Sequence, residues 1–464
     1  MPLRNIVIIA VMAVFSLACY GVSAKNRHAN LFAEALETVD NQALYELTQE
    51  ELFDAAMNGM LSKLDQHSQY ISGNNFKVFD EDIRQEFGGI GMYFRMDPDS
   101  KRIRVTAAMP GTPAFEAGLL PGDTIMEIEG ESTFEMSNAD AVEAMRGKAG
   151  TAVNLKIKGS EGELMVKLVR KLIPVASVHG DIRNLDGTWN YRLKENPRIG
   201  YIRLLQFGDK SVDEFRKALE QIEGKVDGLI IDLRNNRGGL LTAAVDISDM
   251  FLDQELLIVQ TRGRKNVLLD EHYSTSQVAM NPNLPLVILI NRDSASASEI
   301  VAACLRDHKR AVLIGESSWG KGTVQNVIPI QLHKSALKLT TASYWPPNGE
   351  NFDREFMNDD PENPEQYGVH PEPDMTVEMT EEEVLENRAQ RAKRDLETLL
   401  GNTTKQNDAQ QTEPPTAETS SPESEASEDS DDDKPTVDRP LQRAIQYFEE
   451  VFGKKIGEVA TSAE

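Results

Sequence analysis

The sequence predicts a multidomain α/β protein in which a small β-rich domain precedes a larger α/β core. Short apolar runs over 226–233 and 284–290 are rich in branched residues, and each leads through a turn of small residues into a helix-like segment. Strands that alternate with helices in this way are typical of an α/β core. A length of 464 residues leaves room for two or three domains.

The first residues have the composition of an export signal. Arg4 precedes an apolar run over 6–18, and the small residues at 22–24 resemble a cleavage site. We therefore expect residues 1–24 to be a signal peptide that is removed after residue 24, and a periplasmic protein. A lipid-modified Cys19 and an uncleaved membrane anchor are two alternatives that the sequence leaves open.

Charge and cysteine content narrow the range of partners. The chain has 49 Lys and Arg against 75 Asp and Glu, which gives a net charge of −26. This charge argues against nucleic acid or an anionic membrane surface as a partner of the bulk of the protein. Removal of the signal segment would leave Cys304 alone, so we expect no disulfide framework and no thiol metal site within the chain.

The stretch over 291–325 carries the strongest chemical signal. The strand predicted over 284–290 ends at Asn291, and a turn dense in small hydroxyl residues leads into a helix expected from about residue 298 to 308. A serine in such a turn lies beside backbone N–H groups and the positive end of a helix dipole. That position suits a nucleophile whose carbonyl adduct becomes an oxyanion.

A serine hydroxyl needs a base, and Lys321 is the better of two candidates. His308 lies about three turns down the helix and has no carboxylate at a telling spacing. Glycines flank Lys321 and let the backbone approach closely, and burial would allow its ammonium group to lose a proton near neutral pH. Gln325, four residues on, is placed to orient the amine through a hydrogen bond.

At these residues the chain resembles the carboxy-terminal processing peptidases, also called tail-specific proteases. Their two motifs stand here as Ser-Ala-Ser-Ala-Ser-Glu-Ile over 294–300 and Gly-Lys-Gly-Thr-Val-Gln over 320–325. The resemblance implies that Ser296 is the nucleophile, Lys321 its general base and Gln325 the residue that positions the lysine. It covers roughly residues 30–377.

A second glycine turn is expected to complete the site. The segment over 232–239 reads Asp-Leu-Arg-Asn-Asn-Arg-Gly-Gly, and the family has a similar segment whose first Gly donates an oxyanion-hole N–H. The resemblance therefore implies that Gly238 and Ala297 supply the two donors. A phosphate-binding loop is the alternative for Gly238 and Gly239, but no Lys-Ser or Lys-Thr pair follows.

Three features depart from the family pattern. Asp293 stands where the family usually has Gly, and Arg237 stands where it has Pro. The loop over 346–367 is acidic and irregular, whereas the family usually has a short run there. Its role stays open, and a position beside the substrate channel is one interpretation.

Residues 85–170 resemble a PDZ domain of the permuted bacterial type. The glycine-rich run over 88–92 and the Gly-Leu-Leu-Pro-Gly-Asp run over 118–123 carry this resemblance. Backbone N–H groups of the loop would bind a terminal carboxylate, and the next strand would offer an edge for peptide addition. The predicted peptide-binding residues are Gly89, Ile90, Gly91 and Met92. A β-domain that acts only as a spacer is the alternative.

Arg146 is a further candidate in this domain, just after a helix predicted over 138–145. In the family a matching Arg is linked to sensing the bound peptide and aligning the protease site. The alternative is that Arg146 only caps the C-terminus of its helix, where a positive charge is favourable.

Apolar spacing and composition divide the rest of the chain. They predict a signal peptide over 1–24, N-terminal helices over 25–80, a helix over 381–400, a disordered acidic linker over 401–439 and a C-terminal helix over 440–464. The resemblance implies a PDZ domain over 85–170 and a Ser–Lys peptidase core over 171–380 with a fold like ClpP and the crotonases.

The sequence thus predicts an exported serine endopeptidase that cleaves proteins near their C-termini. Its partners would be protein or peptide substrates with free C-termini and no nucleic acid, while a homo-oligomer, an adaptor and a membrane tether stay open. No metal or cofactor is implied. A PDZ adaptor on an inactive core would have lost Ser296 or Lys321, and an acyl-CoA enzyme would have no reason to carry a peptide-binding domain.

Overall fold

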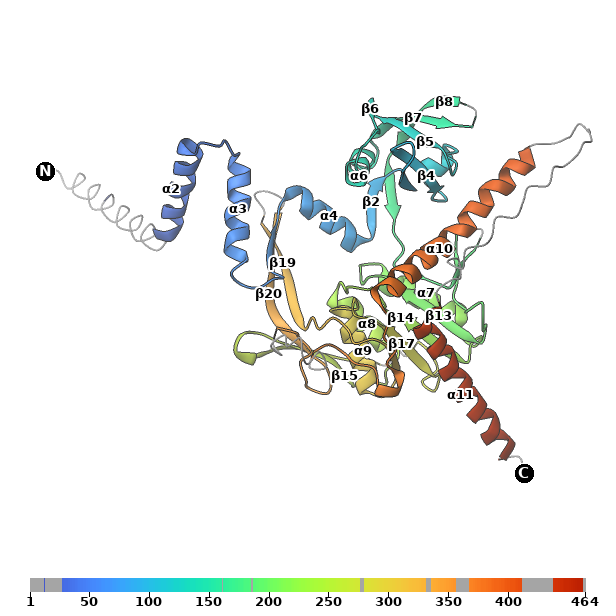
Figure 1. Cartoon of the computed structure of the whole chain (residues 1–464). Coiled ribbons are helices and arrows are strands. Elements are labelled where there is room, and N and C mark those ends of the chain that lie inside the picture. Colours follow the sequence, from blue (N-terminus) through green and yellow to red (C-terminus); the bar gives the residue numbers. More distant parts are fainter. Residues whose placement is uncertain are drawn as a thin grey trace, which may run out of the picture. The chain divides into compact units, whose positions relative to one another are not determined.

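The computed structural model describes Met12 and residues 27–160, 162–184, 187–275, 279–330, 335–355, 367–410 and 437–461 (Figure 1). The predicted signal peptide, apart from Met12, and residues 411–436 of the predicted linker lie outside these ranges. The chain forms two compact units. One contains Met1–Lys77 and Gln325–Thr341, and the other contains Val78–Val324 and Ala342–Glu464.

The first unit joins the N-terminal helices to a distant strand. It contains α2 (Arg27–Gln42), α3 (Gln49–Leu61) and β1 (Gln69–Ile71). Strand β1 pairs antiparallel with the first half of β20 (Ser335–Trp345), with Tyr70 opposite Leu337. Residues 325–341, which the predicted organisation assigns to the peptidase core, therefore belong with the N-terminal helices.

The second unit begins within α4 (Gly73–Arg84) and contains a β-rich domain with its own core. The sheet has the order β3-β4-β5-β7-β8, with β6 on β5. Its elements are β3 (Met92–Asp97), β4 (Arg102–Ala108), α5 (Pro113–Glu116), β5 (Thr124–Ile128), β6 (Glu131–Ser132), α6 (Asn138–Met145), β7 (Ala152–Gly159) and β8 (Gly162–Val169). Alternate residues such as Ile103 and Val105 are buried, as expected for strands with one face on a core.

A two-stranded sheet joins this domain to the following core. Strand β2 (Glu86–Gly89) pairs antiparallel with β9 (Lys171–Pro174). The first residues predicted for the peptidase core thus pair with the first residues predicted for the PDZ domain. The short strands β11 (Ile182–Arg183) and β12 (Trp189–Asn190) form another antiparallel pair beyond it.

The central sheet brings several strand ends to one edge. It consists of β10 (Val178–His179), β13 (Ile199–Leu204), β14 (Gly228–Asp232), β17 (Leu286–Ile290) and β18 (Val312–Gly315), in that order. Strands β13, β14, β17 and β18 are parallel, with Ile230 opposite Val287. Because the C-terminal ends of parallel strands lie at the same edge, the turns that follow β14, β17 and β18 meet there.

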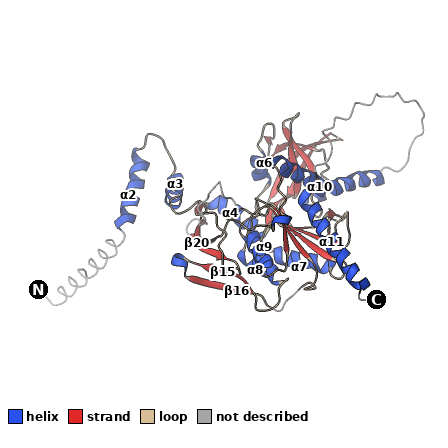
Figure 2. Ribbon diagram, turned by 60° about the horizontal axis from the view of Figure 1, so that its bottom comes forward, coloured by secondary structure: helices blue, strands red, loops and turns tan. Residues whose placement is uncertain are grey.

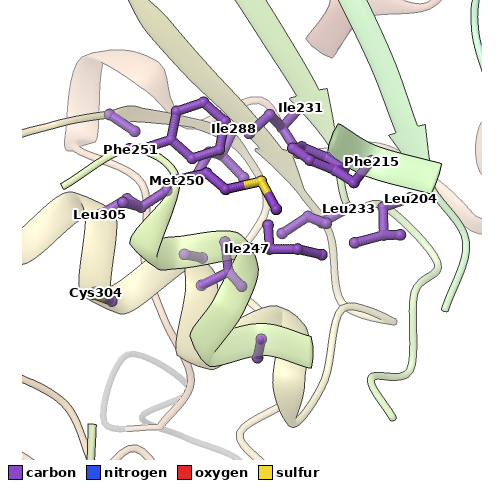
Figure 3. Packing of buried hydrophobic residues seen from close by; sticks show 14 of the residues in the cluster. Leu204, Phe215, Ile231, Leu233, Ile247, Met250, Phe251, Ile288, Cys304 and Leu305 are labelled. Carbon is purple, nitrogen blue, oxygen red and sulfur yellow. The ribbon is translucent and has the colours of Figure 1, made fainter. Parts of the chain in front are cut away.

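Each face of this sheet has its own apolar layer, because successive side chains point to opposite faces. Ile231 and Ile288 pack in one cluster with residues of α7 (Ser211–Ile222), α8 (Leu241–Asp249) and α9 (Ala297–Asp307), as Figure 3 shows. Figure 2 shows these helices beside the strands of the sheet. Ile230 and Val287 pack on the other face with Phe448 of α11 (Arg439–Thr461). The predicted C-terminal helix therefore docks on the core.

The remaining elements flank the central sheet. They are β15 (Leu257–Arg262), η1 (Arg264–Asn266), β16 (Leu268–Tyr273), the second half of β20, η3 (Pro373–Met375) and α10 (Glu381–Gln410). Most of β19 (Thr323–Ile330) belongs to the first unit. Helix α10 continues past the predicted end at residue 400, so the first ten residues after it are helical and not linker. None of the helices in the described part of the chain combines the length and apolarity that a membrane span needs.

Candidate active site

Ser296 lies at the start of α9 in a strained turn. Its backbone has φ 57° and ψ −115°, a conformation that is unfavourable for a residue with a side chain. Two hydrogen bonds hold the preceding turn. Ser294 Oγ donates to the Leu233 carbonyl at 2.8 Å and accepts from the Asn291 N–H at 3.0 Å. Ser294 is therefore a structural turn residue, and Ser296 is the serine at the start of the helix.

The carboxylate of Glu299 joins this turn to the lysine loop. Its Oε2 accepts the N–H of Ser296 at 2.7 Å and the N–H of Lys321 at 2.9 Å. Its Oε1 accepts the N–H of Gly320 at 2.6 Å and the hydroxyl of Ser318. One oxygen atom thus holds the backbones of the predicted nucleophile and the predicted base.

Burial sets the protonation of this carboxyl group. Glu299 is fully buried, and loss of solvent raises its pKa from the ordinary 4.5 to about 7, while the four donors oppose that rise. Because all four contacts are donors, the deprotonated form makes the complete set of hydrogen bonds.

The lysine loop is also held from its other side. Asp353, itself buried, accepts the N–H of Gly322 at 2.8 Å, and the N–H of Arg354 donates to the Gly320 carbonyl at 2.9 Å. A Cβ on Gly322 would lie 2.7 Å from the Cβ of Asp353, so the close approach requires glycine there. The described part of the acidic loop over 346–367 therefore supports the loop that carries Lys321.

The glycine turn after β14 lies directly against the predicted nucleophile, Ser296. Gly238 has φ 94°, and a Cβ on it would come within 2.8 Å of Ser296 Cβ and 2.9 Å of the Ala297 nitrogen. Gly238 and Ala297 are thus neighbours, as an oxyanion pair requires. In this structure the Gly238 N–H donates to Asn236 Oδ1 at 2.9 Å, so it would have to turn from or share that acceptor to bind an oxyanion.

Two of the departures from the family pattern, Asp293 and Arg237, lie beside each other. The guanidinium of Arg237 lies 3.9 Å from the carboxylate of Asp293. Arg388 of α10 donates to the same carboxylate at 2.9 Å and to Asn235 Oδ1 at 2.6 and 2.9 Å. Helix α10 therefore contacts both turns of the site, and this arrangement was not expected from the sequence.

Gln325 belongs to the first unit, where its side-chain amide donates to Thr340 Oγ1 at 3.2 Å. Thr340 in turn donates to Asp65 Oδ1 at 3.0 Å. The role of Gln325 in orienting Lys321 stays a prediction.

The predicted peptide-binding loop connects β2 to β3. Gly89 ends β2, Ile90 is buried, Gly91 has φ 74° and Met92 begins β3. The loop rests on the start of α5, since Thr112 Oγ1 donates to the Gly91 carbonyl at 2.8 Å. A Cβ on Gly91 would collide with the Thr112 side chain at 2.4 Å.

Arg146 follows α6 and contacts more than its own helix. Its guanidinium lies 4.4 Å from the ring centroid of Phe87 in β2 and 3.6 Å from the carboxylate of Glu81 in α4. Its backbone N–H also donates to the Val142 carbonyl at 2.8 Å, which closes the helix. Arg146 thus caps α6 and also connects the β-rich domain to the segment before it.

Sequence reasoning missed Glu299, Asp353 and Asn236. The Ser-x-x-Glu spacing over 296–299 is that of a helix capping box and could have identified Glu299 as a partner of the Ser296 backbone. Asn236 accepts the N–H two residues on, an Asx-turn pattern that its spacing from Gly238 could have indicated. Asp353 acts on Gly322, 31 residues away in the chain, and no spacing rule indicates it.

Known proteins resemble this chain in both domains. Residues 198–362 match Peptidase family S41, and residues 104–159 match a PDZ domain. The "Carboxy-terminal-processing protease" of Bartonella bacilliformis is 38% identical over 329 residues, which cover 69% of this chain and 71% of that protein. The chain belongs to this family. It is therefore a serine peptidase with a PDZ domain before its protease core, and the family and fold class predicted above are confirmed.

Other relatives agree with this assignment. The "Carboxy-terminal processing protease CtpA" of Bacillus subtilis is 32% identical over 323 residues, which cover 68% of this chain and 65% of that protein. Among solved structures, the photosystem II D1 C-terminal processing protease is 24% identical, with 75% of this chain and 92% of that chain covered and a TM-score of 0.41. The assignment rests on the sequence relatives and not on that superposition.

Replacing Glu299 tests the carboxylate that joins the two loops. Glu299→Gln should lower kcat/KM by about 100-fold and the free energy of unfolding by about 2–5 kcal/mol at pH 8. The side-chain NH₂ of Gln would face N–H and O–H donors that now bind a carboxylate oxygen. Each buried donor left without an acceptor costs about 1–3 kcal/mol of stability. Glu220→Gln on the exposed face of α7 is the control. Urea unfolding and steady-state kinetics would measure both effects, and a variant with wild-type values would contradict the role.

The raised pKa of Glu299 also predicts a pH dependence of stability. Between pH 4.5 and about 7 the folded protein holds a proton that the unfolded chain has lost. The contribution of this group is thus complete below pH 4.5 and is lost as the pH rises through 7. Urea unfolding of Glu299→Gln should lack this part of the wild-type decline, and equal pH profiles of the two proteins would show that another group is responsible.

Proposed function

We propose that the protein is an exported endopeptidase that cleaves protein substrates near their C-termini through a Ser296–Lys321 dyad. The observation that carries this proposal is the shared acceptor: Glu299 Oε2 binds the backbone N–H of both residues. Two motifs that are separate in the sequence therefore meet at one atom. Their residue types are those of a serine nucleophile and an amine base.

The chemistry follows from these groups. Neutral Lys321 takes the proton of the Ser296 hydroxyl while Oγ attacks the scissile carbonyl. The N–H groups of Ala297 and, once it has turned from Asn236, Gly238 donate to the oxyanion. Lys321 then gives its proton to the leaving amine, and the same amine activates the water that hydrolyses the acyl-enzyme.

The PDZ domain would select the substrate. Backbone N–H groups of residues 89–92 would bind the terminal carboxylate, and β3 would add the peptide tail as a further strand. Arg146 would report binding to the rest of the unit through its contacts with Phe87 and Glu81.

A PDZ adaptor on an inactive core is the competing function. Such a protein would have lost one member of the dyad, whereas this chain retains both Ser296 and Lys321. Their backbones are also held by a dedicated buried carboxylate. These observations favour the enzyme.

Variants of the dyad test the mechanism. Ser296→Ala and Lys321→Ala should each lower the cleavage of an unfolded protein substrate by about 10³-fold or more, with the fold retained in circular dichroism. Lys321→Arg should be equally inactive, because a guanidinium group cannot act as a neutral base. Wild-type activity should rise between pH 5 and pH 9. Near-normal cleavage by any of the three variants would rule out the dyad.

Peptides that differ only at the terminus test tail recognition. A substrate with a free, apolar C-terminus should be cleaved about tenfold or more faster than its amidated form, because the amide lacks the charge that the loop N–H groups would bind. Arg146→Ala should lower kcat without unfolding the protein. Equal rates for both peptides, together with wild-type kinetics of Arg146→Ala, would show that the PDZ domain is a spacer.

The mature N-terminus tests export. We expect intact mass and N-terminal sequencing to show that the periplasmic protein begins at Lys25, because the small residues at 22–24 fit a signal peptidase. A lipid on Cys19 or a retained N-terminus would replace the soluble form with a membrane-bound one.

A further inference from the structure

Trp319 lies immediately before the Gly-Lys-Gly sequence and is exposed, although both of its neighbours in the chain are buried. The residue is 42% exposed, whereas Ser318 and Gly320 are buried. Large apolar side chains are common on protein surfaces, so exposure alone indicates no function. What distinguishes Trp319 is that its backbone and its ring are both held in place beside the candidate active site.

The backbone of Trp319 joins the two loops of the site. Its N–H donates to the carbonyl of Ser294, two residues before the predicted nucleophile, at 2.9 Å. The next residue, Gly320, donates its N–H to Glu299 Oε1 at 2.6 Å, and the same carboxyl group accepts the N–H of Lys321. A substrate bound at this site must therefore pass close to Trp319.

The ring of Trp319 is held by the end of the chain segment over 346–367. The guanidinium carbon of Arg354 lies 4.9 Å from the centroid of the Trp319 ring and 4.2 Å from that of Tyr367. Arg354 also donates to the Tyr367 hydroxyl at 2.6 Å, and its backbone N–H donates to the Gly320 carbonyl at 2.9 Å. Guanidinium groups stack well on aromatic faces. The Trp319 ring is thus fixed through one face, while much of its surface stays exposed.

The proposed chemistry brings the leaving group of the substrate to the lysine loop. Lys321 would give its proton to the amine of the residue that follows the scissile bond, so this amine must come within hydrogen-bond distance of the lysine. The residue after the scissile bond therefore approaches the loop that carries the Trp319 ring. Because that ring is already fixed, little conformational freedom is lost when a side chain packs on it.

We propose that Trp319 forms an apolar subsite for the residue that follows the scissile bond, and that Arg354 is a positioning residue that holds the ring. This inference rests on the proposed function, because it assumes that Ser296 and Lys321 cleave peptides. Aliphatic and aromatic side chains would pack on the exposed part of the ring and bury apolar surface. The described part of the loop over 346–367 thus contributes to substrate selection through Arg354.

Matched peptides test the subsite. Mass spectrometry first locates the bond that the wild-type protein cleaves in a peptide with a free, apolar C-terminus. Two peptides that differ only in the residue after that bond, Leu or Ala, then give a ratio of kcat/KM values. We expect this ratio to be about 10 or more, because one methylene group in an apolar pocket already gives about 10-fold. Trp319→Ala should lower the ratio to about 1 to 3.

Three further variants separate a subsite from a merely structural effect. Trp319→Phe keeps an aromatic ring and should keep about half or more of the wild-type ratio. Arg354→Ala removes the stacked guanidinium but keeps the backbone N–H on Gly320, and it should give an intermediate ratio. Tyr273→Ala removes another exposed aromatic side chain, in β16, and should keep the wild-type ratio. Circular dichroism would show that each variant is folded.

The outcomes are distinct. If the wild-type protein cleaves no peptide, or Ser296→Ala cleaves as fast as wild type, the proposed function fails and the subsite fails with it. If cleavage depends on Ser296 but Trp319→Ala keeps the wild-type ratio, the dyad stands and the subsite is wrong. Equal cleavage of the Leu and Ala peptides by the wild-type protein would also overturn the inference, as would loss of the preference in Tyr273→Ala. Should Trp319→Ala not fold, a wild-type ratio in Arg354→Ala would refute the proposal.

Discussion

A buried carboxylate with four donors is the interaction on which the site depends. The Glu299 carboxylate accepts the N–H of Ser296, and it also accepts the N–H groups of Gly320 and Lys321 from the lysine loop. The positive φ of Ser296 costs on the order of 1–3 kcal/mol, and hydrogen bonds to a charged group contribute about 1.5–3 kcal/mol each. Burying the charge offsets much of that gain. The main effect of the carboxylate is therefore to fix the relative positions of the two loops, and its net contribution to stability is small.

The sheet explains why these loops can meet at all. Strands β14, β17 and β18 are parallel, so the turns that follow them emerge at one edge. Gly238 then approaches Ser296 so closely that no larger residue would fit. Asp353 supports the lysine loop on the side away from Glu299. Support from both sides is what the proposed dyad needs if its two loops are to keep a fixed separation.

Local patterns could be predicted from the sequence, and contacts between distant segments could not. Helix α6 over 138–145 has the predicted bounds, because apolar spacing and end signals are local. The pairing of β1 with β20 brings residues 325–341 to the N-terminal helices, and a strand carries no local mark of its partner. Gly401 indicated a helix end, yet α10 continues to Gln410, since a single glycine costs only about 1 kcal/mol in a helix.

The same distinction applies within the site. The motifs placed Ser296 and Lys321 on two loops. The capping-box spacing indicated that Glu299 accepts the N–H of Ser296, but it did not indicate the bonds of Glu299 with the lysine loop. The N–H groups of Gly320 and Lys321 donate to Glu299, and the N–H of Gly322 donates to Asp353. These bonds join segments that lie 21 to 31 residues apart in the sequence. A sequence motif identifies the residues that are expected to react. The residues that hold them in place are determined by the tertiary structure and cannot be identified from the motif.

Asp293 and Arg237, where the chain departs from the pattern of the family it resembles, make contacts of their own beside the site. The carboxylate of Asp293 brings a negative charge to the turn before Ser296. Arg237 lies 3.9 Å from that charge, and Arg388 of α10 donates to it at 2.9 Å. The pair with Arg388 is partly exposed, so its effect on folding is small, about 0–1 kcal/mol. Because Arg388 also donates to Asn235, the interaction constrains the separation of the two turns more than it stabilises either one.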